Sequence, residues 1–374
     1  MEMKQIDVAV IGCGQMGETD VTTLESVPEV RRIVGYDPLQ SQLDKLKELH
    51  PNVEVTTNLD DVMNDDAIKL VYITSSNSTH VPMAVRAMRA GKAVMTEKPS
   101  GINYEQIEEL LRVQKETGAF LQVGLECRYS WAYLEAKKII DSGEIGQLKT
   151  VHYTYSQPPA KAEAKLTGGD RQVNWRLDPK NSGNMYLEKL CHYIDLVRWW
   201  NQGSRVDKYV VTTSDNVIPY YGIEDNVHVS YHFDNGCTSH LYFVMTAAPS
   251  GNTGDLSEQD KLGHKLNFVL VGTEGAIEID VFQRQLRVYH HPGKDGVTEG
   301  RLVRTTAWNK DTGKGEGWDE RVYFHNTDAQ NKDIVRRVLA GEPPAIDPED
   351  AQETMRLCME FSDAINRRWE IIER

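Results

Sequence analysis

Residues 7–17, DVAVIGCGQMG, carry the strongest fold signal in this sequence. Residues 7–11 predict a buried strand because four apolar residues, two of them valine and one isoleucine, follow Asp7. The glycines that come next lie where a predicted helix begins. Gly12 allows a tight turn, Gly14 lets the backbone approach a pyrophosphate, and Gly17 lets the helix pack close to the strand. The stretch therefore predicts binding of a nucleotide phosphate at the helix N-terminus. A glycine-rich turn that only joins a strand to a helix is the alternative.

An acidic residue follows the second predicted strand, residues 32–36. Asp37 stands about where a carboxylate accepts hydrogen bonds from the adenine-ribose hydroxyls of a dinucleotide. The same carboxylate would repel a 2′-phosphate, and neither neighbour, Tyr36 or Pro38, is basic. NAD is therefore favoured over NADP. The alternative is that Asp37 only caps the following helix.

The first third of the chain alternates β-branched runs with amphipathic segments, as expected of βαβ units and a parallel sheet. We predict strands at residues 7–11, 32–36, 70–74, 93–96 and 120–124, and helices at 39–49, 80–90 and 104–117. From about residue 131 the rhythm changes to mostly alternating strands bounded by Gly, Asn and Asp. The predicted fold class is α/β: a doubly wound parallel sheet over residues 1–126, then an α/β domain with a large open, mainly antiparallel sheet over 127–374.

Composition and charge exclude several classes of protein. The 374 residues are 40% hydrophobic and 26% charged, which fits a soluble globular chain of two domains. The formal net charge, 42 − 56 = −14, argues against a nucleic-acid partner. We expect no signal peptide and no membrane span, because no apolar run is long enough to cross a bilayer. The five scattered cysteines fit thiols in a reducing compartment, so we expect a cytoplasmic location.

Four further segments add to the dinucleotide signal: TSSNSTH at residues 74–80, GKAVMTEKP at 91–99, NWRLDP at 174–179 and SGNMYLEKLCHYIDLVRWW at 182–200. They resemble the TPNxxH, GKHVxxEKP, WRxDP and GGGxLxDxGxHxxD signatures of the Gfo/Idh/MocA family, which is named for glucose-fructose oxidoreductase, inositol dehydrogenase and a rhizopine catabolism protein. The residues that depart from the usual pattern are Ser76, Asn184, Glu188 and Leu190, with Glu188 in the place of an aspartate.

The resemblance implies an NAD-dependent oxidoreductase with a Rossmann domain and an α/β domain whose open sheet carries the substrate pocket and an oligomer interface. We therefore expect a homo-oligomer, either a dimer or a dimer of dimers. The residues expected to bind NAD are Gly12, Gly14, Gln15, Met16, Gly17, Asp37, Thr74, Ser75, Asn77, His80, Glu97 and Lys98.

Oxidation of a secondary alcohol needs one group that takes the hydroxyl proton and another that stabilises the alkoxide. Glu188 and His192 are spaced i, i+4 on one predicted helix, hence on one face, and Asp195 lies on roughly the same face. His192 suits the role of base because an imidazole takes and returns a proton near neutral pH. The family resemblance implies that Lys98 reaches the same hydroxyl, so we expect Lys98, His192 and Glu188 to be catalytic. Which of the first two is the formal base stays open, and a core histidine beside a surface lysine is the alternative.

Aromatic rings beside charged groups suit a sugar, which presents apolar C–H faces and many hydroxyls. The expected substrate contacts are Lys98, Arg128, Tyr153, Trp175, Arg176, Glu188, His192 and Asp195. For most of the rings, packing in the core or at an interface is the alternative. We expect no metal, because no CxxC or HExxH motif brings the histidines and acids together.

The leading hypothesis is an NAD-dependent oxidoreductase that acts on a secondary hydroxyl of a small-molecule carbohydrate: a sugar, a glycoside or an inositol. Oxidation of a glycoside at C3 to a 3-keto sugar is one form of it. A second hypothesis is a glycosidase that uses NAD for transient oxidation with no net redox change. A third is a non-catalytic NAD-binding sensor, against which the presence of Lys98 and His192 argues.

Overall fold

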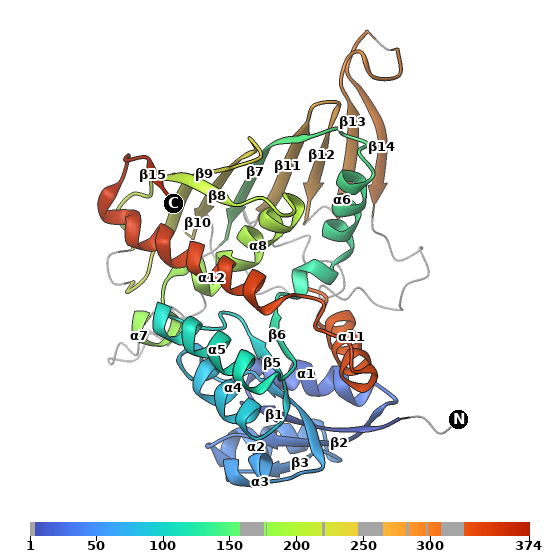
Figure 1. Cartoon of the computed structure of the whole chain (residues 1–374), viewed down its shortest axis with the longest axis vertical. Coiled ribbons are helices and arrows are strands. Elements are labelled where there is room, and N and C mark those ends of the chain that lie inside the picture. The colour runs from blue at the N-terminus through green and yellow to red at the C-terminus, as the bar shows by residue number, and fades with distance from the viewer. Residues whose placement is uncertain are drawn as a thin grey trace.

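The computed structural model describes residues 4–157, 176, 178–218, 221–245, 265–281, 284–296, 298–307 and 325–374. These residues form a six-stranded and a nine-stranded sheet, which lie toward opposite ends of the molecule (Figure 1). Among the described residues, no helix is both long and apolar enough to cross a membrane.

The N-terminal sheet is parallel throughout, with the strand order β3-β2-β1-β4-β5-β6. Its strands are β1 (Ile6–Ile11), β2 (Val30–Tyr36), β3 (Glu54–Thr56), β4 (Ile68–Ile73), β5 (Ala93–Glu97) and β6 (Leu121–Gly124). The strand order reverses between β1 and β4, and open α/β sheets bind ligands at the carboxyl ends of the strands at such a point. The predicted doubly wound sheet is confirmed.

Helices cover both faces of this sheet because alternate residues of each strand point to opposite sides. Ala9 and Ile11 pack with α4 on one face, whereas Val8 and Val10 pack with α1 and α2 on the other. The helices are α1 (Gln15–Glu25), α2 (Gln40–Leu49), α3 (Leu59–Met63), α4 (His80–Arg89) and α5 (Tyr104–Thr117), with a 3₁₀ turn η1 (Asn77–Thr79) before α4.

The C-terminal sheet has the order β14-β13-β12-β11-β7-β10-β9-β8-β15. Only the central pair, β7 and β10, is parallel, and every other pair is antiparallel. The strands are β7 (Leu148–Ser156), β8 (Val206–Val211), β9 (Asn226–Phe233), β10 (Thr238–Val244), β11 (Lys265–Gly272), β12 (Gly275–Asp280), β13 (Gln285–His290), β14 (Arg301–Ala307) and β15 (Ile372–Glu373). The predicted mainly antiparallel sheet is confirmed.

Helices pack on one face of this sheet, between it and the N-terminal domain (Figure 1). They are α6 (Trp131–Asp141), α8 (Cys191–Trp200) and α12 (Pro348–Asp363). Two further helices, α7 (Pro179–Ser182) and α11 (Thr327–Ala340), lie against η1 and α1 of the N-terminal domain, respectively. Shorter turns are η2 (Glu126–Tyr129), the π-helical η5 (Tyr186–Leu190), η6 (Lys294–Gly296) and η8 (Ala364–Arg367). The other face of the sheet carries part-exposed side chains, among them the stacked rings of His152 and His240 and the exposed Tyr242. The expected self-association stays a prediction.

Helix α11 returns to the N-terminal domain and lies beside α1 (Figure 1). Ile334 and Val335 belong to the same buried cluster as Val8 and Tyr72. Asn331 Nδ2 also donates a hydrogen bond of 2.8 Å to Asp20 Oδ1 on α1. The chain thus returns to the first sheet after leaving it at β6, and the division at residue 126 stays a prediction.

Candidate active site

The glycine-rich turn between β1 and α1 is shaped for a pyrophosphate. Gly12 has a φ of +98°, and a Cβ there would lie 2.6 Å from the backbone of Ser75. A Cβ on Gly17 would lie 2.0 Å from the carbonyl oxygen of Gly12, so both positions require glycine. A Cβ on Gly14, in contrast, would meet nothing within 4 Å. The turn therefore leaves open space directly before Gln15, at the N-terminus of α1, where phosphates bind.

Asp37 fastens the end of β2 to this turn. Cys13 N donates to Asp37 Oδ2 and Leu39 N to Asp37 Oδ1, each at 2.9 Å. The N-cap of α2 is Leu39, so Asp37 is not the capping residue that the alternative required. Each carboxylate oxygen keeps a lone pair for a further hydrogen bond, as a ribose diol would need.

Hydrogen bonds to the glycine turn and to the loop after β5 fix the loop that follows β4. Thr74 Oγ1 donates to the carbonyl oxygen of Gly12 at 2.6 Å, which ties β4 to the glycine turn. His80 is buried, and its Nδ1 and Nε2 lie 2.8 Å and 3.0 Å from the carbonyl oxygens of Pro99 and Ser75. His80 therefore joins the loop after β4 to the loop after β5, and its expected contact with NAD would be indirect.

Lys98 lies at the carboxyl end of β5 and reaches toward the second domain. Its Nζ donates to the backbone oxygen of Glu188 at 3.1 Å, and its backbone N donates to Glu97 Oε2 at 3.2 Å. Burial disfavours the charged amine, but the surrounding negative charges, chiefly Glu188, outweigh it and hold the pKa of Lys98 above its usual value. Lys98 is therefore a cation placed between the two domains.

Glu188 is buried and bridges the domains with its carboxylate. Its Oε2 accepts from Asn77 Nδ2 at 3.0 Å and its Oε1 from Arg176 Nη1 at 2.9 Å. Burial opposes ionisation, yet Lys98 and Arg176 overcome it and lower the pKa of Glu188 below its usual value. Asn77, expected to contact NAD, and Arg176, expected to contact substrate, thus both meet this carboxylate.

His192 points to a different set of partners from Glu188, although the i, i+4 spacing predicted one shared contact region. The π-helical turn η5 contains Glu188 and ends just before α8, which changes the rotation between the two residues. His192 Nδ1 lies 3.7 Å from Glu126 Oε2, and its ring centroid lies 4.9 Å from that of His325. Burial lowers the pKa of His192 well below its usual value, so the imidazole is neutral at pH 7.

Glu126, Cys127 and His325 are neighbours of His192 that sequence reasoning missed. Glu126 is buried in η2, directly after β6, and its Oε1 lies 2.5 Å from His325 Nδ1. Cys127 Sγ lies 3.7 Å from the same nitrogen. An acid at the carboxyl end of a parallel strand is a signal that could have drawn attention to Glu126. His325 lies 199 residues further along the chain and carries no local signal.

Arg128 and Asp195 meet each other in the interior rather than a substrate cavity. Arg128 Nε and Nη2 donate to the two oxygens of Asp195 at 2.7 Å and 2.6 Å, and Nη2 also reaches Asp350 Oδ2 at 2.7 Å. Both side chains are almost completely buried. The ion pair lies in the interior and links η2, α8 and α12. Arg128 and Asp195 were expected to contact the substrate instead.

Tyr153, one of the two aromatic residues expected at the sugar, lies in the core of the second domain. Its ring is fully buried and stacks on Phe268 with centroids 5.5 Å apart. Its hydroxyl lies 3.3 Å from that of Tyr231. Trp175 lies outside the described residues.

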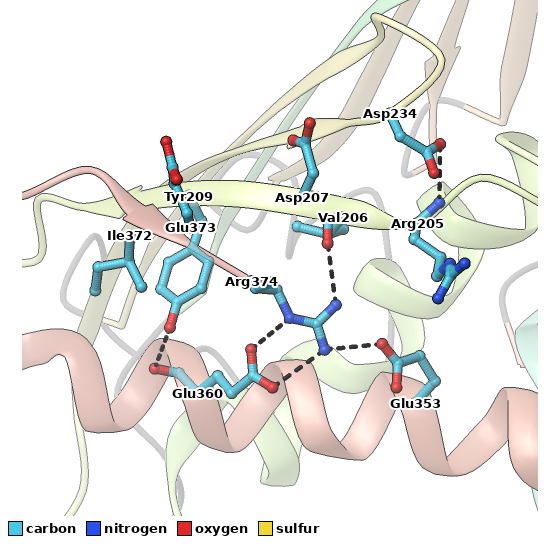
Figure 2. Close-up of a pocket in the computed structure, with 10 residues that line it drawn as sticks. All are labelled: Arg205, Val206, Asp207, Tyr209, Asp234, Glu353, Glu360, Ile372, Glu373 and Arg374. Atoms are coloured by element: carbon cyan, nitrogen blue, oxygen red, sulfur yellow. Dashed lines mark hydrogen bonds and ion pairs between the residues drawn. The ribbon is translucent and has the colours of Figure 1, made fainter.

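A separate open pocket lies where β8, β15 and α12 meet (Figure 2). Arg374 reaches into it, and its guanidinium donates to Glu353, Glu360 and the carbonyl oxygen of Val206. Arg205 N also donates to Asp234 Oδ1 at the rim, and none of the expected site residues lines this pocket. This pocket is therefore distinct from the region around Lys98.

Two family models match the chain in succession. The model described as "Oxidoreductase family, NAD-binding Rossmann fold" matches residues 6–125, and that of the GFO/IDH/MocA C-terminal domain matches residues 133–278. Together the two models account for more than half of the chain.

Relatives and solved structures agree with this match. The chain is 26% identical to scyllo-inositol 2-dehydrogenase (NAD(+)) of Bacillus subtilis over 285 residues, which is 75% of each chain. Levoglucosan dehydrogenase, in complex with NADH and levoglucosan, matches with a TM-score of 0.81 at 19% identity over 99% of each chain. Apo scyllo-inositol dehydrogenase from Lactobacillus casei matches with a TM-score of 0.75 at 21% identity, over 100% of this chain and 99% of the other. The resemblance, the oxidoreductase class and the NAD-binding domain are thereby confirmed: the chain belongs to the Gfo/Idh/MocA family of oxidoreductases.

Proposed function

We propose that the chain oxidises a secondary hydroxyl of a sugar, a glycoside or an inositol and transfers the hydride to NAD. The observation that carries this proposal is the convergence of Lys98 and His192 at the carboxyl edge of the parallel sheet. Lys98 Nζ donates to the backbone of Glu188, one turn before His192, and His192 lies against Glu126 at the end of β6. The loops that shape the glycine turn lie on the same edge of the sheet.

The charges of the two groups suit the reaction. Bound NAD supplies the acceptor for the hydride at C4 of its nicotinamide ring. The ammonium of Lys98 stabilises the alkoxide that develops as the hydroxyl loses its proton. His192 is uncharged and lies close enough to Lys98 for the lysine charge to contribute to lowering its pKa. Lys98 and His192 thus share the hydroxyl: between them they take its proton and hold the oxygen.

Polar groups around this pair support a carbohydrate as the substrate class. The carboxylate of Glu188, the amide of Asn77 and the part-exposed guanidinium of Arg176 form one connected group of hydrogen-bonding partners. Such a group matches the several hydroxyls of a polyol, and a glycoside oxidised at C3 to a keto sugar belongs to the same class. The names of the dehydrogenases similar to this chain support the same class.

The test is a panel of inositols, free sugars and glycosides with NAD, in which NADH is followed by its absorbance and products by mass spectrometry. We expect stoichiometric NADH and a product two hydrogens lighter than its substrate. Release of an aglycone without NADH would instead support the glycosidase that oxidises only transiently. NAD binding without turnover of any compound would contradict the proposal in favour of a sensor.

Asp37 should make the chain select NAD over NADP. A 2′-phosphate would meet a carboxylate that already holds the turn, so we expect NAD to bind at least about tenfold tighter, about 1.4 kcal/mol. Titration of both cofactors by fluorescence quenching or calorimetry measures the ratio. Asp37→Asn should reduce the ratio of NAD affinity to NADP affinity. Asp44→Asn, on the solvent side of α2, should leave this ratio unchanged. Equal affinity of the wild-type chain for the two cofactors would contradict this assignment.

A further inference from the structure

We propose that Glu126, Cys127, His192 and His325 bind a zinc ion. Each of these residues can offer one ligand atom, and the four atoms lie within 4.8 Å of one another. They come from three separate segments: η2 after β6, the first turn of α8, and the residues just before α11. No metal was expected from the sequence, because no CxxC or HExxH motif brings the histidines and acids together.

Two of the four side chains have a buried polar atom that the protein leaves unsatisfied. Within the described part of the chain, neither Glu126 Oε2 nor His192 Nδ1 has a hydrogen-bond partner. Both side chains are about 95% buried, and the two atoms lie 3.7 Å apart. Burying a carboxylate oxygen and a ring nitrogen without partners is unfavourable, and a cation bound between them would satisfy both.

The donor set and its spacing suit zinc better than a harder cation. One thiolate, two imidazoles and one carboxylate are all ligands that zinc takes in tetrahedral sites. With bonds of about 2.0–2.3 Å, neighbouring ligand atoms of such a site lie roughly 3.3–3.8 Å apart. The separations of 3.7 Å between His192 and Glu126, and between Cys127 and His325, already match this spacing. The contact of 2.5 Å between Glu126 Oε1 and His325 would give way to two bonds to the metal.

Charge points to the same conclusion. Metal binding would displace the proton of Cys127, and the resulting thiolate together with the carboxylate of Glu126 would carry two negative charges, which one divalent cation neutralises. Bound there, the ion would join η2, α8 and the start of α11, and so fix the two domains relative to each other beside Lys98.

The ion is compatible with the proposed catalysis because an imidazole has two nitrogens. With a metal on Nδ1, Nε2 would carry the hydrogen and His192 would donate it to the substrate oxygen, so the hydroxyl proton would pass to Lys98 in its neutral amine form, which becomes the ammonium. The zinc site itself does not depend on the proposed function.

The experiment uses the full chain, stripped of metal with a chelator and then titrated with Zn²⁺ or Co²⁺ alone, without NAD or sugar. We expect one equivalent of zinc per chain by elemental analysis. With Co²⁺ we expect the intense visible bands of a tetrahedral site and a thiolate-to-cobalt charge-transfer band. Cys127→Ser should abolish the charge-transfer band and weaken zinc binding at least about 100-fold, since the loss of outer partners alone costs roughly 10–100-fold.

Cys191→Ser is the matched control, because Cys191 is buried next to His192 but donates to the backbone oxygen of Leu187. It should keep both the stoichiometry and the charge-transfer band. The proposal is overturned if the wild-type chain takes up no zinc, if cobalt binds without the charge-transfer band, or if that band survives Cys127→Ser. Because no turnover is measured, none of these outcomes bears on whether the chain is a sugar dehydrogenase.

Discussion

Replacing Lys98 or His192 with alanine is expected to reduce turnover by roughly 10²–10⁴-fold, while folding and NAD binding survive. Lys98→Ala removes the cation that stabilises the alkoxide, and His192→Ala removes the second group on the same hydroxyl. The glycine turn and Asp37, which we expect to hold the nucleotide, are fixed by contacts in which neither Lys98 nor His192 takes part. Steady-state turnover on the substrate found in the panel, with NAD affinity measured in parallel, gives the two readouts.

The double variant should be little worse than the poorer single one, because two groups that act on one proton do not contribute additively. Glu188→Gln should be milder than either, since the amide keeps the volume and can still accept from Asn77 or Arg176. Lys69→Ala, on the exposed side of β4, is the control for loss of a lysine. Lys98→Ala should also leave the zinc titration unchanged, which separates its role from metal binding. Turnover of either alanine variant within about threefold of wild type would contradict these roles and reopen the sensor hypothesis.

Asp195→Asn is expected to lower the free energy of unfolding by about 3 kcal/mol, because it leaves the buried guanidinium of Arg128 without its main counter-charge. The substitution keeps the side-chain volume, so the loss reports the charge and its two hydrogen bonds rather than a cavity. Asp350 also contacts Arg128, but it is part-exposed and is shared with Arg198. Urea denaturation followed by circular dichroism measures the effect.

The matched control is Glu116→Gln, which removes the charge of an exposed i, i+4 pair with Arg112. Such pairs contribute about 0.3–0.5 kcal/mol to the free energy of unfolding, so the urea midpoint of Glu116→Gln should hardly change. The same variants decide between the interior position of Asp195 and the substrate contact expected from its sequence. An unchanged stability of Asp195→Asn together with a raised KM would favour the substrate contact.

The Rossmann half of the molecule was predictable because its signals are local. A strand, a glycine turn and a helix follow one another within residues 7–17, and the geometric need for glycine at positions 12 and 17 is met inside that same unit. The acid after β2 was equally accessible, since the strand end fixes where Asp37 lies. The alternation of apolar and polar residues was enough to predict the mainly antiparallel second sheet. The same pattern did not indicate that β7 and β10 pair in parallel.

The candidate site was only partly predictable because side-chain direction and distant contacts leave no local pattern. The π-turn η5 separates the partners of Glu188 from those of His192, whereas i, i+4 spacing assumes an ordinary helix. Arg128 and Asp195 are 67 residues apart in the sequence, and Glu126 and His325 are 199 residues apart, yet each pair is in contact. The sequence supplied the residue types for both pairs, and only the packing of η2 against α8 and α11 brings them together.

The core of the first domain is completed only after α11 has been synthesised. Ile334 and Val335 complete a core whose strands end at Gly124, so about 200 residues must be translated between the two. At the usual elongation rate of about 5–20 residues per second, the nascent first domain keeps an uncovered apolar surface for about 10–40 seconds. During that interval it is a natural client for a ribosome-associated chaperone, and a fragment cut at the apparent domain boundary would keep that surface exposed permanently.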